Sequence, residues 1–146
     1  MTAPSADTAR HPLLDESGLP YGLPDFASIT DADLEPAIRA AIDDHAAEVA
    51  AVVALPEEPT AENTVVALER SGRALHRVLS TFYGLLGPDA TPARLEVDRV
   101  VSPLLAAHHS AIMSDPALYA RVDTVFRAVE DGLLDLDDET ARLVRR

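Results

Sequence analysis

Residues 60–86 read TAENTVVALERSGRALHRVLSTFYGLL, and this stretch decides the fold. Its apolar positions recur at alternating intervals of three and four residues: Val65, Leu68, Gly72, Leu75, Leu79, Phe82 and Leu86. This spacing gives one apolar stripe along a helix and is typical of a helix in a bundle. Thr60 is a suitable N-cap, Gly72 would let another helix approach closely, and Gly87 with Pro88 ends the pattern. The stretch therefore predicts one long helix from Thr60 to Leu86.

The same helical period continues on both sides of this stretch. We expect a first helix over residues 33–55, with an apolar stripe formed by Leu34, Ile38, Ile42, His45, Val49 and Val52. A third helix should follow Thr91-Pro92 and a fourth should follow Asp115-Pro116, because a capping side chain precedes proline at the first helical position. Pro103 should bend the third helix, and Gly132 should end the fourth.

A last helix is expected to start at residues 137–139, with Leu143 and Val144 behind it, and it looks cut short because the sequence stops soon afterwards. No run shows the sustained alternation of a strand. The predicted fold class is therefore all-α: an antiparallel helical bundle of four main helices, preceded by an extended N-terminal strap, with the last helix truncated.

Residues 1–29 are expected to form that strap, and residues 30–146 the helical part. Proline and glycine at positions 12, 20, 22 and 24 forbid a regular helix there. Apolar side chains nevertheless recur along it, at Leu13, Leu14, Leu19, Tyr21, Leu23 and Phe26. A disordered tail rarely carries so many apolar groups. The strap should lie against an apolar surface, either of this domain's own helices or of a partner.

The amino-acid composition limits the classes of function that the chain could have. The chain has 146 residues, which fits one domain, and no cysteine, which excludes disulfides and thiolate metal sites. Its net charge of −13 argues against nucleic acid and against anionic membranes as partners. The first 60 residues hold most of this charge, with 12 acidic and two basic residues. No targeting signal or membrane span is evident, so we expect a cytoplasmic protein.

No pattern of catalytic residues is found. His-Glu-x-x-His, the zinc-protease motif, is absent, and no Gly-x-Ser-x-Gly elbow occurs. His45 with Glu48 could place two ligands on one helix face, but it is better interpreted as a histidine at the edge of a core stripe. Of His108 and His109, one should pack and the other should face solvent. A metal site formed by His45, His76 and His108 is a remote alternative.

The charged clusters are interpreted as surface. The acid pairs at residues 43–44, 57–58 and 137–138 lie on helix surfaces or at helix starts, and Ser71 with His76, like His109 with Ser110, does not make a triad. Arg70, Arg73 and Arg77 form a row that could receive a peptide carboxylate, but they are expected to pair with acids of the first helix. We therefore expect no catalytic, cofactor-binding or metal-binding residue within this chain.

Several segments, in order, resemble the beginning of the thimet-oligopeptidase-type zinc metallopeptidases, most closely the bacterial peptidyl-dipeptidase and oligopeptidase A branch. They are PLL at 12–14, LPYGLPDF at 19–26, PTAENTVVALERSG at 59–72, PLLAAH at 103–108 and DPALYARV at 115–122. The segment at 59–72 is the most specific. The resemblance covers nearly the whole chain but only the start of the family's much longer sequence.

The resemblance implies an N-terminal helical region that shapes a substrate channel for short peptides, with zinc held in a later catalytic region. The chain would then be inactive by itself, and its partners would be that catalytic region and oligopeptide substrates. The isolated chain should expose apolar surface and self-associate. The alternative is a free-standing helical adaptor that binds a partner helix.

Overall fold

The computed structural model describes residues 13–134 and 138–144. These residues form a short 3-10 helix, η1 (Pro20–Gly22), a π-helical segment, η2 (Ala61–Val66), and six α-helices. The α-helices are α1 (Asp31–Val53), α2 (Ala67–Arg70), α3 (Arg73–Leu86), α4 (Pro92–Met113), α5 (Pro116–Glu130) and α6 (Asp138–Val144). No strand occurs in these two ranges, and the prediction of an all-α chain is confirmed.

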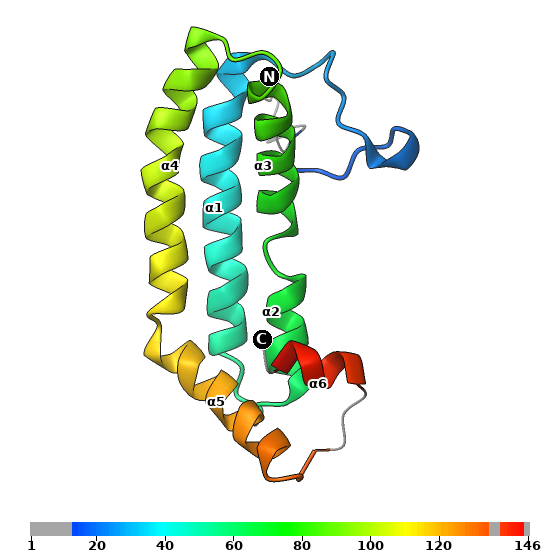
Figure 1. The fold of residues 1–146 in the computed structure, drawn as a ribbon, viewed down its shortest axis with the longest axis vertical. Helices are drawn as coiled ribbons and strands as arrows, with labels where there is room; N and C mark the ends of the chain where they lie inside the picture. The colour runs from blue at the N-terminus through cyan, green and yellow to red at the C-terminus, as the bar shows by residue number, and fades with distance from the viewer. Residues whose placement is uncertain (1–12, 135–137, 145–146) are drawn as a thin grey trace, which may run out of the picture.

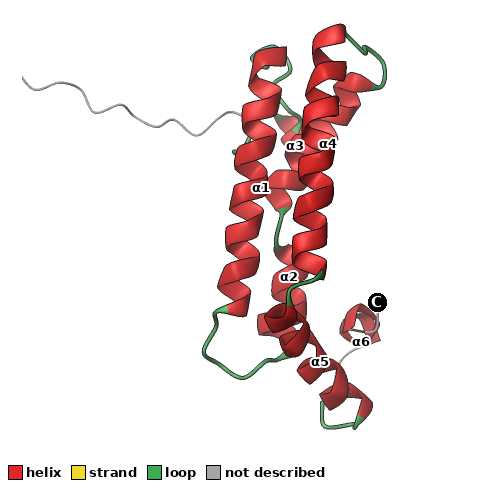
Figure 2. Cartoon of the chain, turned by 90° about the vertical axis from the view of Figure 1, so that its left-hand side faces the viewer, coloured by secondary structure: helices red, strands yellow, loops and turns green. Residues whose placement is uncertain are grey.

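Three long helices form an elongated column, in which α1 packs against both α3 and α4 (Figure 1). The chain descends through α1, returns through α2 and α3, and descends again through α4. The fourth predicted helix, α5, does not lie along this column but turns away beneath it, next to η2 and α6 (Figure 2). No helix in the described ranges combines the length and the apolar character needed to cross a membrane.

The helix starts follow the capping signals in the sequence. The Thr91 hydroxyl accepts a hydrogen bond from the Arg94 backbone N–H, and the Asp115 carboxylate accepts from the N–H groups of Ala117 and Leu118. Both caps are followed by proline at the first helical position, as predicted. At the end of α5, Gly132 has a φ of +69°, which glycine adopts without steric cost.

The predicted continuity of the helix from Thr60 to Leu86 is wrong. The chain leaves the helix at Ser71, which has extended backbone (φ −73°, ψ 162°), and turns through Gly72 in the left-handed region (φ 69°, ψ 15°) before α3 begins. The apolar spacing of three and four residues holds on both sides of this break, so the pattern could not reveal it. Gly72 does lie at a close approach, because a Cβ there would be 3.1 Å from the ring of His45.

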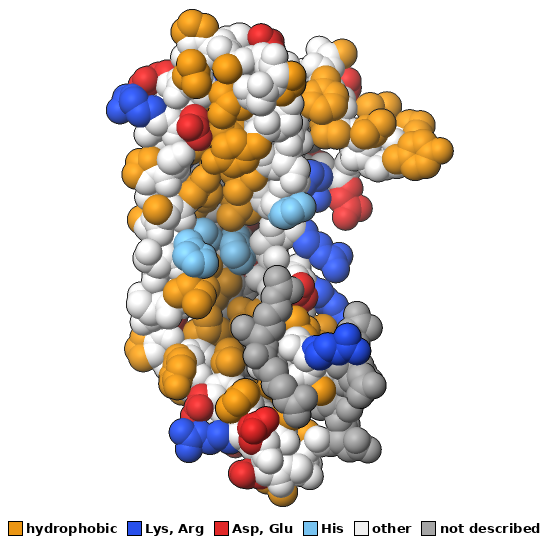
Figure 3. Space-filling view, in the orientation of Figure 1, with side chains coloured by type: hydrophobic (Ala, Val, Ile, Leu, Met, Phe, Trp, Pro, Cys, Tyr) orange, Lys and Arg blue, Asp and Glu red, His pale blue; other side chains and the backbone are white. Residues whose placement is uncertain are grey.

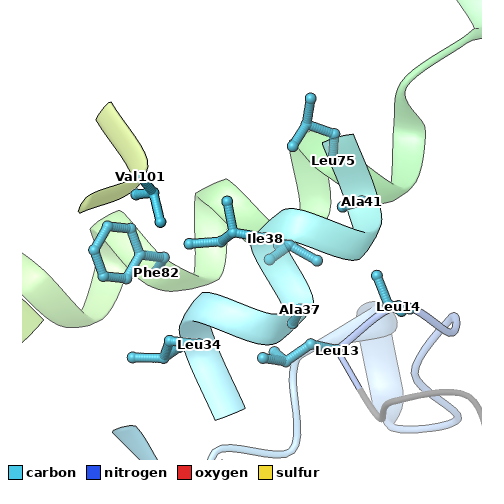
Figure 4. Close-up of a cluster of buried hydrophobic side chains, with 10 residues drawn as sticks. Leu13, Leu14, Leu34, Ala37, Ile38, Ala41, Leu75, Phe82 and Val101 are labelled. Atoms are coloured by element: carbon cyan, nitrogen blue, oxygen red, sulfur yellow. The ribbon is translucent and has the colours of Figure 1, made fainter. Parts of the chain in front are cut away.

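The main hydrophobic core lies in the upper half of the column. It joins Leu34, Ala37, Ile38 and Ala41 of α1 to Leu75, Val78 and Phe82 of α3 and to Val101 of α4 (Figure 4). Leu13 and Leu14 of the strap close this core from the side. Full burial of each large apolar side chain contributes about 1.5–3 kcal/mol, so this half carries most of the hydrophobic stabilisation.

The lower half has a much smaller core, formed by Ala61, Val125 and Val144. A buried arginine of α5 reinforces it: Arg121 is 9% exposed and donates to the backbone carbonyl of Leu55 at 2.9 Å. Longer hydrogen bonds reach the carbonyl of Glu57 and the Oδ1 of Asn63, both at 3.4 Å. Polar contacts therefore hold α5 to the loop after α1.

The apolar side chains of the strap are buried at one end of its described part and exposed along the rest. Leu13 and Leu14 are buried against this domain's own helices, as one of the two predicted alternatives requires. The rest of the described strap extends away from the column, and its large apolar side chains are exposed: Leu19 at 46%, Tyr21 at 100%, Leu23 at 55% and Phe26 at 51%. Residues 1–12 of the predicted strap, and residue 137 at the predicted start of the last helix, lie outside the described residues.

Candidate functional site

A polar cluster interrupts the column at the break between α2 and α3. The Ser71 hydroxyl donates to the Leu68 carbonyl at 2.7 Å, and the Ser71 backbone N–H donates to the same carbonyl at 3.0 Å. The Gly72 N–H donates to the Glu48 carboxylate of α1 at 2.6 Å. The backbone N–H groups of Ser71 and Gly72 thus both find partners, and the turn presents the Ser71 oxygen toward α1.

His45 of α1 joins this turn to α4. Its Nε2 lies 3.2 Å from the Ser71 oxygen, and its Nδ1 lies 3.0 Å from Nε2 of His108. The two imidazole rings meet edge to face, with centroids 4.9 Å apart and planes inclined at 66°. His108 packs while its neighbour His109 is exposed, which confirms the predicted division between them.

The hydrogen bonds fix where the protons are. The Ser71 hydroxyl hydrogen is used on the Leu68 carbonyl, so the Ser71 oxygen accepts the proton carried by His45 Nε2. His45 Nδ1 is then an acceptor, and His108 Nε2 must carry the hydrogen that it receives. Protonation of His45 at Nδ1 would bring two N–H groups face to face unless His108 moved its own proton to Nδ1, so it disfavours the present hydrogen bond between His45 and His108.

Electrostatics favours the neutral form of His45. Burial lowers the pKa of His45 below its usual value, and the neighbouring His108 lowers this pKa further, while the Glu48 carboxylate acts in the opposite direction. A neutral His45 is the form that the hydrogen bonds to Ser71 and His108 require.

An apolar groove of about 350 Å³ opens beside this cluster. It is bounded by His45 and Val49 of α1, by Leu68 and Ser71 at the break, and by residues of α4 and α5 that include Met113 and Tyr119. Met113 and Tyr119 are 72% and 69% exposed. Hydrophobic side chains follow the face of the molecule that shows the histidines near its middle (Figure 3).

The cluster does not have the geometry of a nucleophilic or metal centre. His45 donates to Ser71 rather than accepting its proton, so Ser71 is not activated as a nucleophile. Among the described residues no group of three or more His, Asp or Glu side chains is placed to hold a metal ion. Both ring nitrogens of His45 are engaged in hydrogen bonds, so the residues of this cluster do not fit a zinc ion.

The other candidate residues lie elsewhere. Glu48, considered with His45 as a ligand pair, uses its carboxylate on Gly72. His76 is exposed and borders a shallow pocket beneath the strap, so the structure does not bring it to His45 and His108. The side chains of Asp43, Glu57 and Glu58 are exposed, as expected of surface acids.

The predicted pairing of the arginine row with acids of the first helix is wrong for two of its members. Arg70 pairs with Glu62 on its own segment at 2.8 Å, and Arg77 donates to the Leu14 backbone carbonyl of the strap. The break at Gly72 separates Arg70 from Arg77, so the three arginines do not share one helix face. The ion pair to α1 comes instead from Arg94, which binds Asp31 at 2.7 Å and Asp89 at 2.8 Å.

Sequence reasoning missed Arg94 and Arg121. A signal for Arg121 was present, because residues 118, 121, 122 and 125 lie on one helix face and Arg121 is their one charged member. The fold and this cluster together describe an all-helical chain whose central polar groups join helices to one another.

The sequence of the chain is similar to those of known peptidases. The chain is similar to two curated proteins named dipeptidyl carboxypeptidase: it is 39% identical over 134 residues to the one from Salmonella typhimurium and 36% identical over 137 residues to the one from Escherichia coli. These matches cover 92% and 94% of the chain. The chain spans about a fifth of the length of these relatives, 19% and 20% respectively. No protein-family model matches the chain.

Because the Salmonella match takes in 134 of the 146 residues, it includes the cluster around His45 and the described part of the strap. The similarity supports the relationship to peptidases that the sequence predicts.

Proposed function

We propose that this chain is the N-terminal helical part of a dipeptidyl carboxypeptidase-like enzyme of the thimet-oligopeptidase type. Such an enzyme would remove dipeptides from the C-terminus of short peptides with a zinc-activated water. The helices would form a wall of the channel that admits these peptides, and the zinc and its ligands would belong to a later region. The observation that carries the proposal is the similarity to two dipeptidyl carboxypeptidases over more than nine tenths of the chain.

The geometry of the chain supports a scaffold role. Its central histidine and serine are consumed in contacts between helices, so they are not free to act on a substrate. The column is long and its upper core is well packed, which suits an element that must keep its shape next to a reacting centre. The proposal therefore assigns positioning to this chain and chemistry to the rest of the longer protein.

A chimera tests this proposal. The stretch of the Salmonella enzyme that matches the chain is replaced by the chain, and release of C-terminal dipeptides from an N-blocked tetrapeptide is measured. We expect the chimera to fold and to release dipeptides, whereas the same enzyme with the stretch deleted should not. The chain alone should release none.

Two controls separate the alternatives. A chimera that carries Phe82→Ala would have a cavity in the main hydrophobic core. It should lose both stability and activity, because Phe82 is fully buried. A chimera that carries Tyr83→Ala, at an exposed neighbouring position, should keep both. If the chimera folds but releases no dipeptide while the chain alone is stable, the proposal is contradicted and the chain acts as a free-standing helical adaptor.

A further inference from the structure

The exposed half of the strap is a built structure rather than a loose loop. Residues 15–28, here called the hook, are tied by backbone hydrogen bonds from Gly22 to the Leu19 carbonyl at 3.0 Å and from Ser28 to the Asp25 carbonyl at 3.0 Å. Side chains add to this order, because Ser17 accepts from the Leu19 N–H at 3.1 Å and Asp25 accepts from the Ala27 N–H at 3.2 Å. The hook therefore holds a shape that a partner could recognise without first ordering it.

The tip of the hook presents an aromatic side chain at a steric cost. Tyr21 has a φ of 63° and a ψ of 14°, in the left-handed region that favours glycine, and Gly22 follows with a φ of +66°. These two successive positive φ values make a tight turn, and a tyrosine in the left-handed region costs about 1–2 kcal/mol relative to a relaxed backbone. Burial of the Tyr21 side chain does not offset this cost within the described chain, because that side chain is 100% exposed.

Beneath the hook lies a hollow of about 450 Å³ between the strap and α3. Apolar side chains of Leu13, Leu19 and Ile29 line it, and Arg77 and Thr81 of α3 form its floor. The hook projects from the upper part of the column (Figures 1 and 3). Together they form one concave surface with an apolar interior and an aromatic tip.

The charge of this surface indicates its partner. Asp15, Glu16 and Asp25 border the hollow, and within the part of the chain that the structure describes none of the three has an ion pair. The one cation of the hollow, Arg77, already donates to the Leu14 carbonyl. No basic residue occurs between Leu13 and Ile38. The complementary partner would therefore carry apolar side chains next to lysine or arginine.

We propose that the hook and the hollow beneath it hold an extended segment of the longer protein, one that carries an apolar side chain beside lysine or arginine. This inference rests on the proposed function for the source of the segment. The chain spans about a fifth of its relatives, so most of such a protein lies outside these 146 residues, and the hook lies within the matched stretch. The hook would then clasp the helical scaffold to the remainder.

Peptide binding to the purified chain tests this proposal without reference to activity. Short overlapping fluorescent peptides tile the part of the Salmonella relative that lies outside the match, and their anisotropy is measured as the chain is added. We expect a small group of peptides to bind, and these should share an apolar residue next to lysine or arginine. Raising the salt concentration from about 50 to about 500 mM should weaken this binding, because exposed charge pairs are screened.

The variant Tyr21→Gly removes the aromatic side chain without disturbing the backbone of the hook. Glycine fits the left-handed backbone at this position, so the hook keeps its shape while its tip is removed. Peptide affinity should fall about tenfold or more, as expected for an aromatic anchor. The control variant Tyr119→Ser removes a tyrosine that is 69% exposed on α5, at the other end of the molecule, and should bind the peptides normally.

The proposal would be overturned if no peptide of the set binds, or if Tyr21→Gly binds the peptides as well as the unaltered chain does. A concentration-dependent dimer that dissociates in Tyr21→Gly would also overturn it and would assign the hook to a second copy of the chain. These outcomes concern peptide binding by the chain alone. The proposed function is tested separately, by dipeptide release from the chimera, so the two proposals can fail independently.

Discussion

The two halves of the column are held together by different forces. In the upper half, α1, α3 and α4 bury Phe82, Leu34, Ile38, Val78 and Val101 completely. In the lower half the buried apolar cluster is smaller, formed by Ala61, Val125 and Val144, and Val49, Val52 and Leu118 are also buried. Polar contacts join the elements here as well: Arg121 donates to the Leu55 carbonyl, and His45 binds Ser71 and His108.

The difference has a physical consequence. Apolar burial is proportional to area and tolerates small displacements, whereas hydrogen bonds in a partly buried site depend on distance and angle. The upper half should therefore determine whether the chain folds, and the lower half should determine how α5 and the break at Gly72 are positioned. Four predictions test this comparison, from the largest expected effect to the smallest.

The largest effect is expected in the upper core. Phe82→Ala should lower the free energy of unfolding by about 3–5 kcal/mol, because it removes a fully buried aromatic side chain and leaves a cavity. Val125 lies in the lower cluster and is also fully buried. Val125→Ala removes its two methyl groups and should lower the free energy of unfolding by about 1.5–2.5 kcal/mol. Urea denaturation followed by circular dichroism measures both, and equal losses would contradict the proposed dominance of the upper half.

The next effect concerns the break between α2 and α3. Gly72→Ala should destabilise the chain by about 1–2 kcal/mol, since alanine is disfavoured in the left-handed region, and its Cβ would also press on the His45 ring at 3.1 Å. Gly84→Ala is the matched control: it lies within α3 with open space around its Cβ position, and should stabilise the chain by about 0.5–1 kcal/mol. Thermal unfolding of the two variants should give shifts of opposite sign.

The start of α5 should respond less strongly. Asp115→Ala removes an N-cap that accepts two backbone hydrogen bonds, and should cost about 1 kcal/mol. Asp123→Ala removes an acid of the same helix that pairs with the exposed Arg127, and should cost about 0.5 kcal/mol or less. Hydrogen exchange at the first turn of α5 measures the difference, and an Asp115 variant with unchanged protection would show that the cap is not needed.

The smallest effect is a pH dependence. Because the pKa of His45 is lowered in the folded chain, the unfolded chain binds more protons just below the ordinary pKa of about 6.5. The stability that comes from neutral His45 is therefore present above about pH 6.5 and is lost as the pH falls through this window. The urea midpoint should fall between about pH 7.5 and about pH 5.5.

The variant His45→Gln should flatten this pH dependence, because it removes the titrating group. His109→Gln changes an exposed histidine next to His108 and should leave the slope as it is. A slope that is unchanged in His45→Gln would mean that the contact between α1 and α4 does not require the neutral imidazole.

The sequence predicted the helical class and several helix starts because their signals are local. Thr91-Pro92 and Asp115-Pro116 cap their helices as expected, and the stripe of Leu34, Ile38, Val49 and Val52 is buried as expected. The break at Ser71–Gly72 escaped prediction because it is stabilised by partners far along the chain: Glu48 accepts from Gly72, and His45 binds Ser71. A periodicity within one segment carries no information about such partners.

The strap and the histidine cluster show the same limit. Sequence alone suggested that the strap covers an apolar surface, but only the fold shows that Leu13 and Leu14 do so while Tyr21 and Phe26 face solvent. Likewise the sequence placed His45 in an apolar stripe and expected one of His108 and His109 to pack, but the contact of His45 with His108 depends on how α1 packs against α4. The residues alone predicted local features such as helix caps. They did not predict which distant elements would contact each other.

The most direct measurement of the central claim is the rate at which the chimera, with this chain in place of the matched fifth of the Salmonella dipeptidyl carboxypeptidase, releases C-terminal dipeptides. We expect release within about tenfold of the unaltered Salmonella enzyme, since a tenfold change corresponds to a loss of about 1.4 kcal/mol in transition-state stabilisation. A chimera that is fully folded yet releases no dipeptide would contradict it, as would dipeptide release by the 146-residue chain on its own.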